Sequence, residues 1–210
     1  MKIFITIIVI IILWSLWGYF SSRVEQLEYS VIEKRDGYEI RKYSEHIVAQ
    51  TTVEGDYDYA LGEGFRIVAG YIFGGNEKKE KVAMTAPVIE EPTKEEDKFE
   101  KIAMTAPVIF DEDSSSRTIS FSMPKKYTLD TLPTPSDSRV KLVEIPEKKM
   151  AVLNFSWFRS EKVVEKKKEE LKMLLEKDRI KTLSTFSYAG YNAPWTPPWM
   201  LRNEVLVEIE

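Results

Sequence analysis

The sequence predicts an α+β domain, in which two helices cover an antiparallel sheet, preceded by a separate apolar helix at the N-terminus. Three observations lead to this prediction. Strand and helix patterns follow one another twice in the order strand, strand, helix, strands, which indicates two similar halves. Each half contains one helical segment with a single apolar face, which is suited to covering a sheet. Residues 3–20 carry no charge and form a segment of their own.

The composition of the 210 residues excludes several classes of function. Cysteine is absent, so disulfides, zinc–thiolate sites and thiol catalysis are excluded. The net charge is −4 with acidic and basic residues interspersed, so we expect no nucleic-acid partner. His46 is the only histidine, and any histidine-based metal site or Ser-His-Asp triad would depend on it.

The N-terminal run, residues 3–20, reads IFITIIVIIILWSLWGYF. A helix of this length spans roughly 27 Å, close to the hydrocarbon thickness of a bilayer. Trp14, Trp17 and Tyr19 gather at its C-terminal end, as residues of an interfacial aromatic belt do. A cleaved signal peptide is the alternative, but the run is long for one and lacks a small-residue cleavage site. We therefore predict a single-pass membrane anchor over residues 1–23.

The charges on either side of this run predict its orientation. Lys2 and the α-amine precede the run, whereas Arg23 after it is soon joined by Glu25 and Glu28. Because positive charge favours the cytoplasmic side, we expect a cytoplasmic N-terminus and an extracytoplasmic domain. Residues 24–36 are expected to be a polar linker, and residues 37–210 the domain itself.

The first half of the domain is predicted to contain two strands and a helix. Residues 38–43 and 47–54 alternate as strands around a turn that contains His46. Asp58 is the expected N-cap of a helix that continues through Phe73.

One face of this helix is apolar, and three glycines interrupt the helix. The apolar positions are Leu61, Phe65, Val68 and Ile72. Gly62, Gly64 and Gly70 each cost about 1 kcal/mol relative to alanine inside a helix. We therefore expect a close approach of backbone or ligand to compensate for that cost.

A nine-residue phrase occurs twice, as KVAMTAPVI at residues 81–89 and KIAMTAPVI at residues 101–109. Its β-branched residues favour strands, and the prolines at 87 and 107 mark an edge or a bulge. We expect two paired or equivalent strands joined by a charged loop. Met84 and Met104 are expected to fill the core. Thr85 and Thr105 have no neighbouring base and receive no catalytic role.

The second half repeats the pattern of strands and one helix. Residues 118–123, 140–145, 150–155, 186–191 and 205–209 are predicted strands, and residues 124–138 a proline-containing loop. Ser160 is the expected cap of a helix over residues 161–177, whose lysine- and glutamate-rich run is a solvated face. Residues 194–199 form a loop rich in proline and tryptophan.

Six stretches, taken in order, resemble the SOUL heme-binding protein family. They are Tyr38-Glu39-Ile40-Arg41, Gly64-Phe65, Tyr71-Ile72 before Gly74-Gly75-Asn76, Met84-Thr85-Ala86-Pro87-Val88, Tyr188 with Gly190-Tyr191-Asn192 and Pro194, and Arg202-Asn203-Glu204-Val205. The resemblance covers roughly residues 29–209. It implies a distorted β-barrel of two similar halves, each with one packed helix.

The resemblance also implies a non-enzymatic protein that binds heme or another tetrapyrrole in an apolar cleft. Carried onto this chain, one wall of the cleft would be Leu61, Phe65, Val68, Ala69 and Ile72, and the opposite side Trp195, Trp199 and Met200. Arg66 is the only basic residue between residues 56 and 76 and would face the heme propionates. Arg202 is the nearest basic residue to the aromatic loop.

Two kinds of side chain are candidates for an axial ligand to heme iron. His46 is one candidate, and its alternative interpretation is an exposed turn residue. Met84 and Met104 are candidates by their thioethers, although core packing is the favoured interpretation.

Two other functions remain open from the sequence. The first is a membrane-held interaction or scaffold domain without a tetrapyrrole. The second is a small-molecule hydrolase of a related fold with Glu204 as its catalytic carboxylate. A salt-bridged strand residue is the favoured interpretation of Glu204, because no second catalytic group accompanies it.

Overall fold

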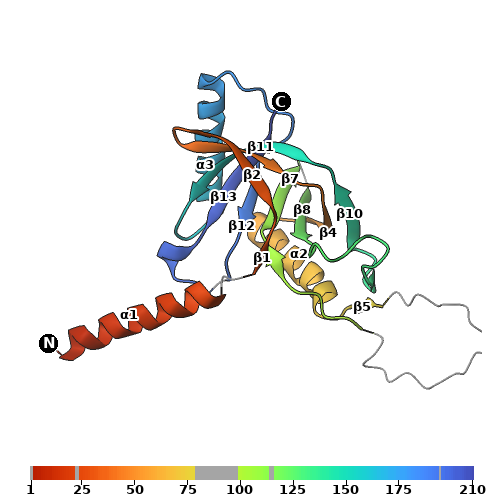
Figure 1. Cartoon of the computed structure of the whole chain (residues 1–210), viewed down its shortest axis with the longest axis horizontal. Helices are drawn as coiled ribbons and strands as arrows, with labels where there is room; N and C mark the ends of the chain where they lie inside the picture. Colours follow the sequence, from red (N-terminus) through yellow and green to blue (C-terminus); the bar gives the residue numbers. More distant parts are fainter. Residues whose placement is uncertain (1, 22–23, 79–98, 114–115, 194) are drawn as a thin grey trace, which may run out of the picture.

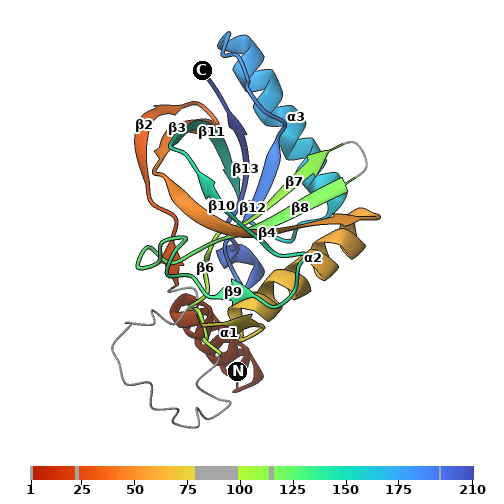
Figure 2. The ribbon, with the colours of Figure 1, turned by 90° about the vertical axis from the view of Figure 1, so that its right-hand side faces the viewer.

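The computed structural model describes residues 2–21, 24–78, 99–113, 116–193 and 195–210. A nine-stranded sheet forms its centre, and every pair of neighbouring strands is antiparallel. In sheet order the strands are β10 (Lys141–Ile145), β4 (His46–Glu54), β8 (Ser116–Ser122), β7 (Val108–Asp113), β12 (Ser187–Gly190), β13 (Asn203–Glu208), β11 (Lys148–Phe155), β3 (Tyr38–Tyr43) and β2 (Tyr29–Arg35). The sheet curls into a half-barrel (Figure 2).

In the described ranges, three α-helices accompany the sheet. They are α1 (Lys2–Ser21), α2 (Tyr57–Ile72) and α3 (Glu161–Lys177), and a short 3-10 helix, η2 (Pro198–Met200), follows later. Helix α2 packs on β4 and β8, whereas α3 packs on β11 and β13. Helix α1 lies at the opposite end of the molecule from α3 (Figure 1). The predicted α+β class, with one helix on each half of an antiparallel sheet, is confirmed.

Two short strand pairs complete the described structure. Strand β1 (Glu25–Gln26) runs parallel to β6 (Thr105–Ala106), and β5 (Asn76–Glu77) pairs with β9 (Thr134–Pro135). Of the repeated phrase, the first copy lies outside the described residues, so its expected pairing with the second copy stays a prediction. The second copy forms β6 and the start of β7 on either side of Pro107.

Alternate residues of each strand pack on opposite faces of the sheet, as the two-residue period of a strand requires. Val205 belongs to the large core beneath α2 and α3, whereas its neighbour Leu206 belongs to a smaller cluster on the other face. We refer to these as the helix-covered face and the opposite face. The helix-covered face holds most of the buried apolar side chains and therefore dominates the hydrophobic stabilisation.

Residues 24–36 are not the linker that the sequence predicts, because they contain β1 and β2. Strand β2 pairs with β3 at the edge of the sheet, with a bulge between Val31 and Glu33. An edge strand with little covering it needs no apolar face, and both Val31 and Ile32 are exposed. The polar pattern that suggested a linker is therefore the pattern of an exposed edge strand.

Two further expectations about local structure need correction. The N-cap of α2 is Asp56, whose Oδ1 accepts a hydrogen bond from the Tyr59 backbone N–H at 2.9 Å, and Asp58 lies in the first turn. Met104 is not core filling but 38% exposed, because it precedes β6 in an irregular segment. By contrast, the predicted cap of α3 is confirmed, since Ser160 Oγ accepts from the Val163 backbone N–H.

Gly64 explains one of the glycines inside α2. A Cβ added there would lie 2.3 Å from Ile119 Cδ1 and 2.7 Å from Ile119 Cγ1 on β8. The helix therefore sits closer to the sheet than any larger residue allows. At Gly62 and Gly70 an added Cβ meets nothing within 4 Å, so these two glycines have a different explanation.

We predict opposite effects of alanine at Gly64 and at Gly70. Gly64→Ala overpacks the contact with Ile119, which costs about 1–3 kcal/mol and outweighs a helix-propensity gain of about 1 kcal/mol. Gly70→Ala gains the propensity without a clash. Thermal unfolding of the full chain in one detergent should show a lower midpoint for the first variant and a higher midpoint for the second. Equal shifts in the two variants would contradict the close packing of α2 on β8.

Candidate functional site

A groove of about 510 Å³ lies beside the first half of α2. Five segments form its walls: the first turns of α2, Val108 at the start of β7, residues 158–159 after β11, the end of β12 with the residues that follow it, and residues 201–203. Most of the side chains on these walls are apolar or aromatic. Small-molecule sites in proteins commonly have volumes of about 300–1,000 Å³ and apolar linings. The groove is therefore large enough for a ligand.

Only two of the five residues predicted for the α2 wall line the groove. Leu61 and Phe65 face it, whereas Val68, Ala69 and Ile72 are buried at the helix–sheet packing. The groove runs along the first half of α2 only, and the sheet covers the apolar stripe beyond it. Periodicity identified the apolar stripe correctly but not which part of it the sheet leaves open.

Gly62 lines the groove, and a side chain there would point into open space. The lack of a side chain leaves this part of the groove open, and the expectation that a ligand occupies the space stays a prediction. Arg66, by contrast, does not line the groove. Its guanidinium is exposed and bonds Glu63 at 2.6 Å on the surface of the helix.

Two polar side chains in the groove were not identified from the sequence. Tyr57 is buried, and its hydroxyl has no hydrogen-bond partner within the described ranges. Burial raises the pKa of Tyr57, and the nearby Arg159 guanidinium opposes that rise. Arg159 is exposed and lies 5.4 Å from the centre of the Tyr188 ring. Of the two basic residues considered from the sequence, Arg202 lines the groove and Arg66 does not, whereas Arg159 is brought to the groove by the chain after β11.

The residues predicted to form the wall opposite α2 do not line the groove. Trp195, Trp199 and Met200 are not among the groove residues, and instead their loop contacts α1. Trp14 Nε1 donates to the Trp195 backbone carbonyl at 2.9 Å. The Trp14 and Trp199 rings meet edge to face with 5.4 Å between their centroids. The groove wall is made instead by the residues that directly follow this loop.

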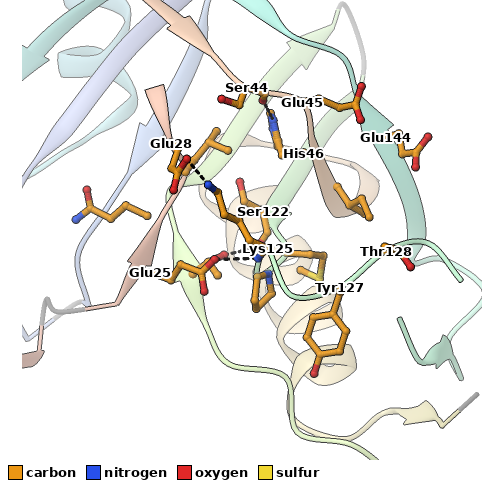
Figure 3. A pocket seen from close by; sticks show the side chains of 16 residues that line it. Glu25, Glu28, Ser44, Glu45, His46, Ser122, Lys125, Tyr127, Thr128 and Glu144 are labelled. Atoms are coloured by element: carbon orange, nitrogen blue, oxygen red, sulfur yellow. Dashed lines mark hydrogen bonds and ion pairs between the residues drawn. The ribbon is translucent and has the colours of Figure 1, made fainter. Parts of the chain in front are cut away.

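His46 begins β4 and lines two other pockets, of about 210 and 290 Å³. Figure 3 shows the smaller one, in which Glu25, Glu28 and Lys125 surround one side and Glu144 the other. His46 Nδ1 lies 2.8 Å from the Ser44 carbonyl oxygen. Burial lowers the pKa of His46, which favours the neutral imidazole. The structure thus does not bring His46 together with the α2 groove.

A metal site is not apparent in the part of the chain that the structure describes. No group of three or more histidine, cysteine, aspartate or glutamate side chains converges there. The acidic residues around His46 therefore do not form a metal centre with it.

Glu204 is fully buried and engaged by three neighbours. Its Oε1 accepts from Arg41 Nη1 at 2.9 Å and from Arg202 Nη2 at 2.7 Å, and its Oε2 accepts from the Tyr191 hydroxyl at 2.6 Å. Burial alone would lower the pKa of Arg41, but the Glu204 carboxylate outweighs burial and raises it. Both oxygens are occupied, which agrees with the interpretation of Glu204 as a salt-bridged strand residue rather than a catalytic one.

The curled sheet, its two packed helices and the groove define an α+β half-barrel domain with a ligand-sized site. The family profile described as SOUL heme-binding protein matches residues 24–208. The chain belongs to this family, as the six sequence stretches indicate.

Two curated relatives and two solved structures extend the comparison. Heme-binding protein 2 of Mus musculus is 32% identical over 185 residues, 81% of each chain, and the Homo sapiens protein of that name is 33% identical over 164 residues, 75% of this chain and 71% of the relative. The EcmrR C-terminal domain superposes with a TM-score of 0.54 at 9% identity, covering 87% of this chain and 98% of that one. A hydrolase from Listeria innocua gives 0.50 at 14% identity, covering 85% and 94%. At these identities, the solved structures indicate a shared fold alone.

We predict that removing the Glu204 carboxylate destabilises the fold far more than removing a neighbouring one. Glu204→Ala leaves two arginines without their buried partner, at a cost of about 3–5 kcal/mol. Glu208→Ala on the same strand breaks a half-exposed pair with Lys148 and costs about 1 kcal/mol or less. Thermal unfolding of both variants measures the difference. Similar losses in the two variants would contradict a dominant role for the buried pair.

Proposed function

We propose that this chain is a membrane-anchored, non-enzymatic protein that binds heme or another tetrapyrrole in the α2 groove. Membership of a heme-binding family supports heme as a ligand. The groove itself is the observation that carries the proposal, because it joins an apolar wall, the open space at Gly62 and the cation of Arg159.

The residues of the groove fit such a ligand. Leu61, Phe65 and Phe158 offer apolar surface to a flat ring. Arg159 would face a carboxylate of the ligand, as arginine commonly does. When bound, heme supplies a planar apolar ring, propionate carboxylates and an iron atom. The buried Tyr57 hydroxyl would meet the ligand as a hydrogen-bond partner or as an iron ligand, since tyrosine serves as an axial ligand in some heme proteins.

The membrane anchor of the proposal is α1. Residues 2–19 are long and apolar enough to span a bilayer, a property that a signal sequence shares. We infer an anchor because the run is long for a signal peptide and ends in interfacial aromatic residues. The flanking charges favour a domain on the extracytoplasmic side.

The groove should lose its ligand when a side chain fills the space at Gly62. We predict that Gly62→Leu weakens hemin binding at least about tenfold, because leucine would occupy volume that the ring needs. Gly70→Leu is the matched control, since a side chain there also meets open space but lies outside the groove. Absorbance titration of the full chain in lipid nanodiscs, corrected for empty nanodiscs, measures both affinities.

His46→Ala belongs in the same titration. We expect this variant to bind hemin as the parent does, because His46 lines other pockets. Loss of the Soret shift in His46→Ala, with Gly62→Leu unaffected, would refute the α2 groove as the site. Absence of a shift in every protein would leave a membrane-held interaction domain as the better account.

Arg159 should matter only for ligands that carry a carboxylate. We predict that Arg159→Ala weakens hemin about fivefold, equivalent to about 1 kcal/mol for an exposed ion pair. The dimethyl ester of protoporphyrin, which lacks the carboxylates, should bind equally well to both proteins. Arg159→Lys should recover part of the loss. An equal effect on the acid and the ester would show that Arg159 acts through packing instead.

A further inference from the structure

Four exposed aromatic side chains form a patch near the C-terminal end of α1. We call Trp157, Phe158, Trp195 and Trp199 the aromatic patch, and each of the four is at least 44% exposed. They come from two separate segments that hydrogen bonds join. The Trp157 backbone N–H donates to the Pro198 carbonyl at 3.1 Å, and Asn203 Nδ2 donates to the Trp157 carbonyl at 2.9 Å. These hydrogen bonds hold the two segments that carry the patch side by side.

The backbone at Trp157 has an unusual conformation. Its φ is +85°, in the left-handed region that bulky residues rarely adopt. The two hydrogen bonds to its own N–H and carbonyl hold this conformation, yet the indole stays 57% exposed instead of entering the core. A fixed, strained conformation that presents an apolar side chain outward indicates an interaction beyond the folded chain.

The loop that carries Trp195 and Trp199 lies alongside the last turns of α1. Trp14 contacts it through a hydrogen bond to the Trp195 carbonyl and through the ring of Trp199. One turn further along the same side of the helix, Gly18 lies against Pro197, where an added Cβ would be 2.5 Å from Pro197 Cδ. The loop thus follows the helix axis past its aromatic end.

The depth of this contact decides which surface the patch meets. Trp14 precedes the end of the apolar run by six residues, about 9 Å along a helix. The apolar run is about 27 Å long, and the hydrocarbon core of a bilayer is about 30 Å thick. The whole run is therefore needed to span the core. A loop that reaches Trp14 must therefore enter the headgroup layer when α1 spans the bilayer. Tryptophan side chains favour that layer.

We propose that the aromatic patch is a second membrane contact, which seats the domain on the lipid surface with the groove facing it. This inference rests on the anchor in the proposed function. Phe158 belongs both to the patch and to the groove wall, and the loop continues directly into Leu201, Arg202 and Asn203 of that wall. A ligand dissolved in the bilayer then reaches the groove along the patch without crossing water.

Because the chain has no cysteine, single cysteines can report the environment of chosen positions. Full-length Trp195→Cys and Phe158→Cys report the patch, Leu13→Cys reports α1, and Met173→Cys on α3 is the water-exposed control. Each is labelled with the fluorophore NBD in phosphatidylcholine vesicles. Lipid-borne nitroxide quenches a label in the bilayer, and iodide quenches a label in water.

The proposal expects lipid quenching and blue-shifted emission at positions 13, 158 and 195, and iodide quenching at position 173. Lipid quenching at position 13 together with iodide quenching at both 158 and 195 would overturn the second contact and leave the anchor intact. Iodide quenching at position 13 as well would overturn the anchor, and the second contact with it. Each cysteine replaces one aromatic side chain of the patch and could weaken the contact that it reports. Two patch positions are therefore tested in separate variants.

Discussion

The buried ion pair between Arg41 and Glu204 is the constraint on which the rest of the structure depends. It joins β3 to β13 across β11, Arg202 donates to the same carboxylate oxygen as Arg41, and Tyr191 donates to the other. Moving two charges out of water is unfavourable unless their hydrogen bonds are fully satisfied. The sheet must therefore hold these strands in one register, and Tyr191 and Arg202 are fixed where they also line the groove. The polar cluster on the opposite face of the sheet thereby positions two of the residues that line the groove.

The same cluster determines the state of the Glu204 carboxylate. Glu204 is the candidate catalytic carboxylate from the sequence, and its oxygens accept hydrogen bonds from two guanidinium groups and a phenol. The groove offers apolar walls, the exposed cation of Arg159 and the buried Tyr57 hydroxyl, which has no hydrogen-bond partner among the residues that the structure describes. Under the proposed function, this set of groups would bind a flat, partly anionic molecule. It agrees with the heme-binding family to which the chain belongs.

Much of the fold could be predicted from the sequence because local patterns carry it. The two amphipathic helices, the cap at Ser160 and most of the strands follow from spacing and turn residues alone. Strand β2 was missed because an exposed edge strand has the polarity of a loop. Met104 was misjudged because its β-branched neighbours suggested a strand that begins only at Thr105.

The site was predicted less completely, since it depends on what covers each apolar surface. Leu61 and Val68 lie on the same stripe of α2, but only the first is left open to the groove. Trp195 and Trp199 were predicted to line the wall of the groove. They contact Trp14 of α1 instead, and local sequence patterns do not show a contact between residues so far apart in the chain. Arg159 lines the groove because of the direction that the chain takes after β11, and no local sequence pattern predicts that direction.

The central claim is that the α2 groove, and not the pockets beside His46, receives the ligand. Amide hydrogen exchange of the full chain in nanodiscs, with and without saturating hemin, tests it most directly, because a ligand slows the local opening of the segments that it contacts. We expect slower exchange in residues 57–65, 188–193 and 201–203, with residues 44–48 unchanged. Slower exchange confined to residues 44–48 and their neighbours in β10 would contradict it.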